Sequence, residues 1–327
     1  MQLGHTAGLK SSGRQLRDAF GDALLDVCRN NPKVVVLDGD LGNSTRVNLV
    51  RQEFPERFLN IGIAESNLVS IAAGYASCGY IPFVSSFPSF LFCNAYDQVR
   101  VSISIAALNV KFVGSHAGIS TNREGPQPMS IEDFALVGGL PPFVILAPSD
   151  PASMAGAVRA AVKHAGPVYI RSSRTVFPDI YVEGECPFEI GKANVVRGGS
   201  DVTLIACGMM VAVALDAAAL LEAQGVEARV LDMHTVKPLD REAIAAAARE
   251  TGAIVTAEEH LIHGGLGSGV AQVVTTTHPV PMRCIGFDDT YAESGSVVEL
   301  MDKYGLSAKD IVAAAQEAIA AKKGGEQ

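Results

Sequence analysis

Short runs of apolar, often β-branched residues alternate along the first half of the chain with longer, alanine-rich segments. The apolar runs lie at 33–37, 81–85, 110–114, 143–146 and 168–170, and the longer segments at 13–29, 66–77, 97–107 and 152–164. Such continuous apolar runs are typical of parallel strands buried on both faces, and the segments between them are long enough for helices. Asp150 and Pro151 indicate a helix start, because aspartate caps free N–H groups and proline fits the first turn. The pattern predicts an α/β sheet covered by helices on both faces.

The second half repeats this alternation after an irregular stretch. Strands are predicted at 202–206, 228–231, 254–257 and 282–285, with helices at 211–224, 241–250 and 266–276. The stretch between the two series contains Pro178, Gly184 and Pro187 and follows neither period, which is typical of a linker. We therefore predict a first domain at 1–175, a linker at 176–191 and a second α/β domain at 192–327, with both ends of the chain as plain tails.

Composition narrows the function class. With 327 residues, 48% of them hydrophobic, the chain can bury two cores. Its net charge of -9 without clustered Lys or Arg argues against a nucleic-acid or polybasic membrane surface. The six cysteines form no CxxC pair, so we expect buried reduced thiols and a cytoplasmic protein. The N-terminus lacks the apolar core of a signal peptide, and no apolar stretch is long enough for a membrane span.

Polar residues that directly follow predicted strands are the first candidates for a site, because ligands bind at the carboxyl ends of parallel strands. Four such clusters occur, at 38–44, 62–67, 85–92 and 114–118, the last continuing into 124–126. From the pattern alone each also has a structural interpretation. Glu65 suits the start of a helix, phenylalanines at helical spacing are often core, and His116 could be a hydrogen-bonded structural histidine.

A family resemblance decides between these interpretations. The segments GIAESNLVSIAAGYA, AYDQVR, GSHAGIS followed by EGP, and AEEHLIHGGLGSGVA occur in this order. Over nearly its whole length the chain resembles the pyrimidine-binding domain of transketolases followed by their C-terminal domain. The resemblance implies a thiamine-diphosphate enzyme that transfers a two-carbon ketol unit from a ketose phosphate to an aldose.

The resemblance also implies cofactor-binding residues. Glu65 matches the family's glutamate, which hydrogen-bonds the aminopyrimidine ring and, when protonated, stabilises the imino tautomer that starts catalysis. Phe87 and Phe90 match the aromatics that stack on the pyrimidine. The segment carries one extra residue, so Phe92 is a rival to Phe90. Asp40 matches an aspartate near the cofactor, or caps the helix after Ser44.

For the substrate, the resemblance places Arg14, Ser44 and Arg174 at the sugar-phosphate end. His116 lies close by and is assigned to both substrate binding and catalysis. Arginine and hydroxyl donors suit a phosphate, although any single arginine could instead form a surface salt bridge, and Arg171 could replace Arg174. Many transketolases have aspartate where this chain has Glu124, and a histidine or glutamine near Pro128. Substrate-binding Glu124 therefore indicates an unusual ketose or acceptor, such as a branched or modified sugar phosphate.

The family's diphosphate-binding motif, Gly-Asp-Gly with a later asparagine, does not occur in context, and Asp38-Gly-Asp40 has the wrong order. We assign no metal ligand to this chain. Mg²⁺ and the diphosphate are expected on a separate transketolase N-terminal subunit, in a heterotetramer of two large and two small subunits. His260 and His263 are interpreted as structural. Two alternatives stay open: the β subunit of a 2-oxo-acid dehydrogenase E1 component, and a non-catalytic scaffold or regulatory subunit.

Overall fold

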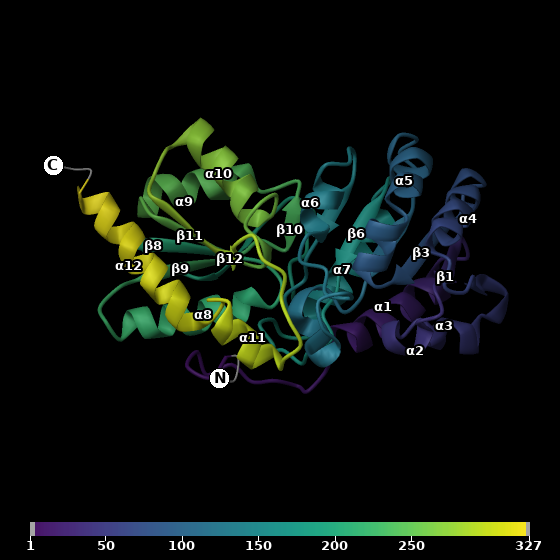
Figure 1. Cartoon of the computed structure of the whole chain (residues 1–327), viewed down its shortest axis with the longest axis horizontal. Coiled ribbons are helices and arrows are strands. Elements are labelled where there is room, and N and C mark those ends of the chain that lie inside the picture. The colour runs from purple at the N-terminus through teal and green to yellow at the C-terminus, as the bar shows by residue number, and fades with distance from the viewer. Residues whose placement is uncertain (1–3, 325–327) are drawn as a thin grey trace.

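The computed structural model describes residues 4–324, which form two α/β lobes side by side (Figure 1). The first lobe is built on a seven-stranded sheet of order β10-β5-β6-β4-β3-β1-β2. Its strands are β1 (Val34–Asp38), β2 (Phe58–Asn60), β3 (Ile81–Ser86), β4 (Lys111–Gly114), β5 (Val144–Leu146), β6 (Val168–Arg171) and the antiparallel β10 (Thr235–Lys237). Its α-helices are α1 (Leu16–Asn30), α2 (Gly42–Thr45), α3 (Asn48–Glu53), α4 (Glu65–Ser77), α5 (Tyr96–Gln98), α6 (Asp133–Gly138) and α7 (Pro151–Lys163).

The second lobe contains a five-stranded sheet of order β12-β11-β8-β9-β7. Its strands are β7 (Asn194–Arg197), β8 (Val202–Ala206), β9 (Ala228–Asp232), β11 (Ile254–Leu261) and β12 (Met282–Phe287), with β7 antiparallel to β9. Its helices are α8 (Met210–Glu222), α9 (Arg241–Thr251), α10 (Leu266–Thr277), α11 (Val297–Lys303) and α12 (Ala308–Gly324). The predicted fold class, two tandem and mainly parallel α/β sheets covered by helices, is confirmed.

The predicted strands are all present, and those at the centre of each sheet are buried along their length. The strands that the pattern missed are β2, β7 and β10, which have only three or four residues and lie at sheet edges. Edge strands need no continuous apolar run, because one side faces solvent or a loop. The apolar pattern therefore detects the core strands and the longer edge strand β12, but not the three shortest edge strands.

The helix predicted at 97–107 is wrong in type. The chain forms the short α5 and then a π-helical turn at Val99–Ser104, preceded by another π-helical turn at Phe90–Asn94. A π turn absorbs one extra residue into a helical segment and occurs often at functional sites. The π turn at Phe90–Asn94 would accommodate the extra residue expected in the aromatic segment, and the apolar spacing alone could not show this turn.

The predicted helix start at Asp150 is confirmed. Its carboxylate accepts a hydrogen bond from the Ser153 N–H at 2.8 Å, and Ser153 completes a capping box, with Pro151 in the first turn. The other carboxylate oxygen accepts N–H bonds from Ile180 and Tyr181 at 2.9 and 2.8 Å. One buried cap therefore also anchors the irregular segment that follows the first sheet.

The prediction of plain tails is wrong at both ends within the described residues. The N–H groups of Gly4, Thr6 and Ala7 donate to the carboxylate of Asp216 in α8, so the segment before α1 extends beneath the second lobe (Figure 1). At the other end, α12 packs its apolar side, including Ile311 and Ala315, into the core. Both segments bury backbone or apolar groups, which tails would leave in solvent.

The predicted linker 176–191 contains no helix or strand. Because β10, from the second half of the sequence, pairs with β5, the two halves share the first sheet. The predicted domain limits remain a proposal, and residues 1–3 and 325–327 lie outside the described part.

All six cysteines are free, but only Cys28 and Cys207 are buried, so the expectation of buried thiols is wrong for the exposed Cys78, Cys93 and Cys284. Within residues 4–324, no helix combines the length and apolar character that crossing a membrane requires.

Candidate active site

A cavity of about 800 Å³ lies at the N-terminus of α4, with Glu65 on its wall. Glu65 is the first residue of the helix and is only 3% exposed. Its carboxylate accepts a hydrogen bond from the Asn94 amide at 3.2 Å. The remaining lining is mostly apolar or amide: Ile63, Ser89, Phe90, Cys93, Pro126, Gln127, Met129, Glu132 and Tyr291. A buried carboxyl that faces an apolar cavity of this size can hydrogen-bond a flat heteroaromatic ring.

Three stacked rings lead from this cavity toward the carboxyl end of β4. Phe90 stacks on Phe87 with ring centroids 5.4 Å apart, and Phe87 stacks on His116 at 4.4 Å. Phe92, the rival to Phe90, is fully buried in the core against Phe112 and Tyr169. The π turn directs Phe90 to the cavity and Phe92 to the core, which leaves Phe90 as the aromatic that lines the cavity.

His116 is buried and neutral. Burial, together with the nearby cations Arg174 and Arg17, lowers the pKa of the imidazole to about 3. Its Nδ1 lies 2.8 Å from the Ser115 hydroxyl, and its backbone has a positive φ of 63°. Positive φ is costly for a residue other than glycine and tends to occur at functional sites. With Nδ1 bonded by Ser115, a neutral ring has Nε2 available for a second partner.

Cationic side chains surround this histidine. Arg174 Nη1 donates to Glu124 Oε1 at 2.5 Å, and both side chains are partly exposed. Arg17, in the first turn of α1, donates from Nη1 to the backbone carbonyl of Ser44 at 3.2 Å. Arg17 and Arg174 thus lie near His116; Arg17 contacts the Ser44 carbonyl, and Arg174 pairs with Glu124.

Arg14 is not part of this cluster. Its guanidinium pairs with Asp22 and, at 3.4 Å, with Glu183. It lines a separate cavity of about 610 Å³ whose wall also carries Asp26 and Asp179. The salt-bridge interpretation of Arg14 therefore describes the structure, and this acidic surrounding does not suit a phosphate.

Asp40 lies exposed after β1 with a positive φ of 65°. It accepts a hydrogen bond from Asn60 at 2.8 Å, and Asn60 in turn accepts the N–H of Gly62. The capping alternative for Asp40 is wrong, because the helix after Ser44 is α3, whose N-cap residue is Val47 and which has no side-chain cap. Asp40 instead braces the loop that leads to Glu65.

Comparison with known proteins places this site in a family. Residues 12–179 match the family model of the transketolase pyrimidine-binding domain, and residues 191–311 match the model of the transketolase C-terminal domain. The chain belongs to the transketolase family. Membership of this family implies dependence on thiamine diphosphate.

Several split transketolases are similar over almost their whole length. The 6-deoxy-6-sulfo-D-fructose transketolase subunit SqwH of Clostridium sp. (strain MSTE9) is 43% identical, covering 92% of this chain and 94% of that protein. A subunit of the apulose-4-phosphate transketolase of Phocaeicola vulgatus is 36% identical, with coverage of 93% and 97%. A solved structure described as "Split gene transketolase, inactive beta4 tetramer" has a TM-score of 0.88 and 44% identity, covering 95% of this chain and 100% of that one.

The cavity fits the pyrimidine end of thiamine diphosphate. Within the described residues, the Glu65 carboxylate has a single hydrogen-bond partner, Asn94, so it retains acceptor capacity toward the cavity. Phe90 supplies a flat apolar face beside it. A buried carboxyl that can form further hydrogen bonds, beside an aromatic wall, matches an aromatic ring that carries polar atoms at its edge.

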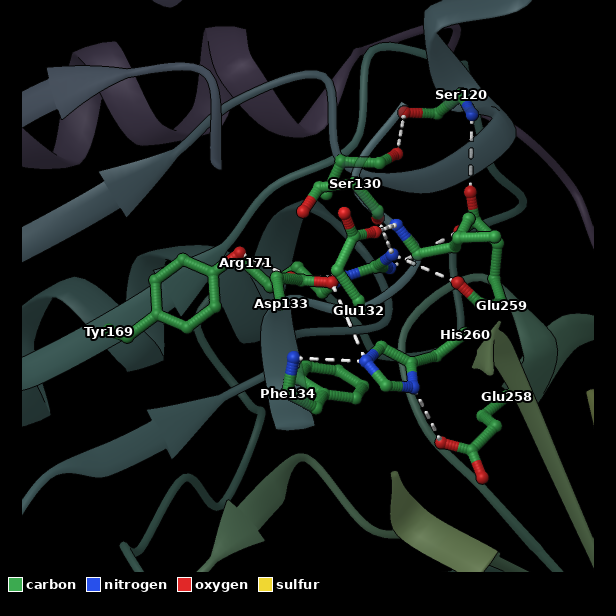
Figure 2. Close-up of polar contacts among 12 residues, drawn as sticks. Ser120, Ser130, Glu132, Asp133, Phe134, Tyr169, Arg171, Glu258, Glu259 and His260 are labelled. Carbon is green, nitrogen blue, oxygen red and sulfur yellow. Dashed lines mark hydrogen bonds and ion pairs between the residues drawn. The ribbon is translucent and has the colours of Figure 1, made fainter. Parts of the chain in front are cut away.

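A buried ionic network joins this site to the second lobe (Figure 2). Arg171 at the end of β6 pairs with Asp133 at 2.9 Å and with Glu259 of β11 at 3.4 Å. Tyr169 also donates to Asp133, at 2.5 Å. Arg171 is buried here, so it cannot replace Arg174 in the sugar-phosphate pocket. No local motif indicated this role, because the partners of Arg171 are distant along the chain.

The same network reaches the backbone of Arg174. Glu259 accepts the Ser120 N–H at 3.1 Å, and the Ser120 hydroxyl accepts the Arg174 N–H at 3.2 Å. His260 accepts the Phe134 N–H at 3.0 Å and is fully buried, which confirms its structural interpretation, whereas His263 is exposed. The second lobe therefore fixes the backbone that carries Arg174.

Sequence reasoning missed several cavity residues. Asn94 lies four residues after Phe90, a spacing that places two residues on one helical face, and this could have revealed it. Gln127 lines the cavity beside Pro128 and supplies an amide donor that Pro128 lacks. Tyr291 comes from the loop after β12, and no local pattern marks it.

The network predicts a pH dependence of stability. Burial raises the pKa of Glu258 to about 8 and that of Glu259 to about 7. The folded state therefore holds protons that the unfolded state releases, so this stabilisation is complete below the ordinary glutamate pKa and is lost as pH rises through about 7 to 8. We expect the free energy of unfolding to fall as pH rises from about 4.5 to about 8 and to level off above that, measured by urea denaturation. Glu259→Gln should make this decline shallower, whereas the surface variant Glu317→Gln should not; parallel curves for all three proteins would contradict the assignment.

Proposed function

We propose that this chain, paired with a diphosphate-binding transketolase subunit, transfers a two-carbon ketol unit from a ketose with a terminal anionic group to an aldose. The observation that carries the proposal is the buried Glu65, which faces the cavity beside Phe90. We place Mg²⁺ and the cofactor's diphosphate on the partner, and the reaction in the cytoplasm. The expected assembly is a heterotetramer of two large and two small subunits.

Each residue has a defined role in this proposal. Bound thiamine diphosphate supplies the carbon nucleophile. Glu65 hydrogen-bonds the pyrimidine ring and exchanges the proton that the tautomer change requires, while Asn94 orients the carboxyl. Phe90, backed by Phe87, packs on the ring, and Asp40 braces the approaching loop.

At the other end of the ring stack, neutral His116 has Nε2 free for a sugar oxygen, and Nε2 donates in the tautomer whose Nδ1 accepts from the Ser115 hydroxyl. Ser44 and Arg174 lie where the resemblance puts the anionic end of the sugar. Glu124 is paired with Arg174, which places a carboxylate beside that end. A carboxylate there favours a ketose whose hydroxyl pattern or tail differs from common sugar phosphates.

Related proteins support an unusual substrate. The names of two similar proteins specify 6-deoxy-6-sulfo-D-fructose and apulose 4-phosphate, which are modified sugars with a terminal sulfonate and a terminal phosphate. We propose that this chain also takes a modified ketose. The cationic surroundings of His116 do not favour the E1 β alternative, whose substrates have no such tail.

The requirement for a partner has structural support at the cavity rim. Ile63 is 84% exposed and Tyr291 is 69% exposed, although both are apolar and line the cavity. Burying large apolar side chains against another chain is favourable, at about 25 cal/mol per Å². The related split transketolase described as an inactive β4 tetramer agrees with a subunit that lacks activity on its own.

Reconstitution tests the proposal. The chain is mixed with a diphosphate-binding subunit, thiamine diphosphate and Mg²⁺, and ketol transfer from ketose phosphates and ketose sulfonates is followed by product analysis. We expect transfer only when both chains are present. Activity of the chain alone would overturn the partner requirement, and decarboxylation of a 2-oxo acid without ketol transfer would favour the E1 β alternative.

A further inference from the structure

The loop between β12 and α11, residues 288–296, brings one side chain of the second lobe to the cavity of Glu65. That side chain is Tyr291, and the other described residues of the cavity wall all belong to the first lobe. Tyr291 is 69% exposed, although Phe287 before it and Ala292 after it are buried in the core. The second lobe therefore presents an aromatic ring to a site that the first lobe otherwise forms.

This loop is attached to the first lobe as well as to the second. The Ser294 hydroxyl donates to the backbone carbonyl of Arg123 at 2.6 Å, and α11 packs against the turn 118–124 that contains Arg123. Asp289 has a positive φ of 43°, a conformation that is costly outside glycine and tends to occur at functional sites. The surrounding contacts therefore hold the backbone of the loop in one place, with the Tyr291 ring at the cavity.

Packing within the chain does not explain the position of this ring. The neighbours of Tyr291 provide the contacts with the core, and the ring itself remains largely in solvent. Covering an aromatic side chain is favourable, because it removes a large apolar area from water. A flat ring that is hydrogen-bonded by Glu65 and packed on Phe90 has a further apolar surface toward the cavity. Tyr291 is the aromatic residue of the second lobe that can cover this surface.

We infer that Tyr291 of the second lobe packs against the aminopyrimidine end of bound thiamine diphosphate and so binds the cofactor together with Glu65 and Phe90. This inference rests on the proposed function, and it gives the second lobe a direct part in the active site. The apolar face of a phenol ring suits such packing, while the hydroxyl at its tip stays in contact with water or with the partner chain at the rim. Contact with a partner and contact with the cofactor are therefore compatible, and they can be measured separately.

Calorimetric titration of thiamine diphosphate, with Mg²⁺ present, into the cofactor-free complex of this chain and its diphosphate-binding partner tests the inference. We expect Tyr291→Ala to raise Kd about 3- to 10-fold, the range that corresponds to one lost aromatic pair. Tyr291→Phe should stay within about twofold of the unchanged complex, because it keeps the ring. Tyr80→Ala is the matched control, since Tyr80 is also exposed but packs on Tyr75 outside the cavity lining, and it should leave Kd unchanged.

Tyr291→Leu covers the case in which Tyr291→Ala does not assemble. Leucine keeps an apolar side chain for contact with the partner but lacks the flat ring, so Kd should rise here as well. Size-exclusion chromatography verifies that each variant elutes with the partner, and thermal unfolding verifies that it folds.

A kinetic readout distinguishes cofactor binding from a general loss of structure. For Tyr291→Ala, the cofactor concentration that gives half the maximal rate should rise by the same factor as Kd, and kcat at saturating cofactor should change little. Equal Kd values for Tyr291→Ala, Tyr291→Leu and the unchanged complex would overturn the inference. If the complex binds thiamine diphosphate but transfers no ketol unit, the proposed function fails, and the titration still decides the role of Tyr291.

Discussion

Glu65→Ala should abolish ketol transfer while leaving the fold and the assembly intact. Proton transfer by a positioned side chain contributes roughly 10²- to 10⁴-fold to a rate, and a loss of this order is expected in kcat of the reconstituted complex. Glu65→Gln should lose nearly as much, because an amide keeps the size and can still hydrogen-bond the pyrimidine but does not exchange a proton as a carboxyl does. The measurement is single-turnover transfer at saturating cofactor.

The fold should tolerate these changes, because Glu65 makes one side-chain hydrogen bond and faces a cavity. Asn94→Ala is the matched control: it removes the partner that orients the carboxyl but keeps the carboxyl itself. We expect a smaller loss in kcat for Asn94→Ala than for either Glu65 variant. A Glu65→Ala complex with unimpaired turnover would refute the proposed mechanism outright.

The core strands could be predicted from the sequence because a strand buried on both faces must be apolar throughout, as in β8 and β3. The cap at Asp150 was equally predictable, since it depends on residues three apart. The sequence could not predict which aromatic residues of the aromatic segment face the cavity, because apolar spacing does not reveal the π turn at Phe90–Asn94. It is this turn that separates Phe90 from Phe92.

Some residues of the site could likewise be predicted from the sequence, and others could not. The sequence placed Glu65 at a helix start and His116 just after a strand, where the structure has them. Arginines were harder to assign, because a long side chain reaches several directions from one backbone position. Arg14 turns toward Asp22, Arg171 into the interior and Arg17 toward Ser44, according to carboxylates and carbonyls contributed by distant segments. Such choices depend on tertiary contacts, which spacing does not encode.

Arg171→Ala should be the most destabilising single change in the network of Figure 2. The side chain is 7% exposed, and its partners Asp133 and Glu259 are at most 2% exposed. Above about pH 7, where Glu259 is ionised, removing the cation leaves two buried carboxylates without compensation, which typically costs about 3–5 kcal/mol. We expect the free energy of unfolding in urea to fall by about that amount. Arg171→Lys should recover only part of it, because an ammonium cannot reproduce the guanidinium's bonds to Asp133 and to the Glu259 carbonyl.

Arg174→Ala is the matched control, since Arg174 lies three residues away with a side chain 40% exposed. An exposed pair contributes about 0–1 kcal/mol, so this variant should unfold nearly like the unchanged chain. Its defect should instead appear as a raised KM for an anionic ketose. The two substitutions would then have distinct effects: Arg171→Ala would lower stability, because Arg171 compensates buried carboxylates between the lobes, and Arg174→Ala would raise KM, because Arg174 is proposed to face the substrate. Equal stability of Arg171→Ala and Arg174→Ala would show that the buried network contributes little to holding the lobes together.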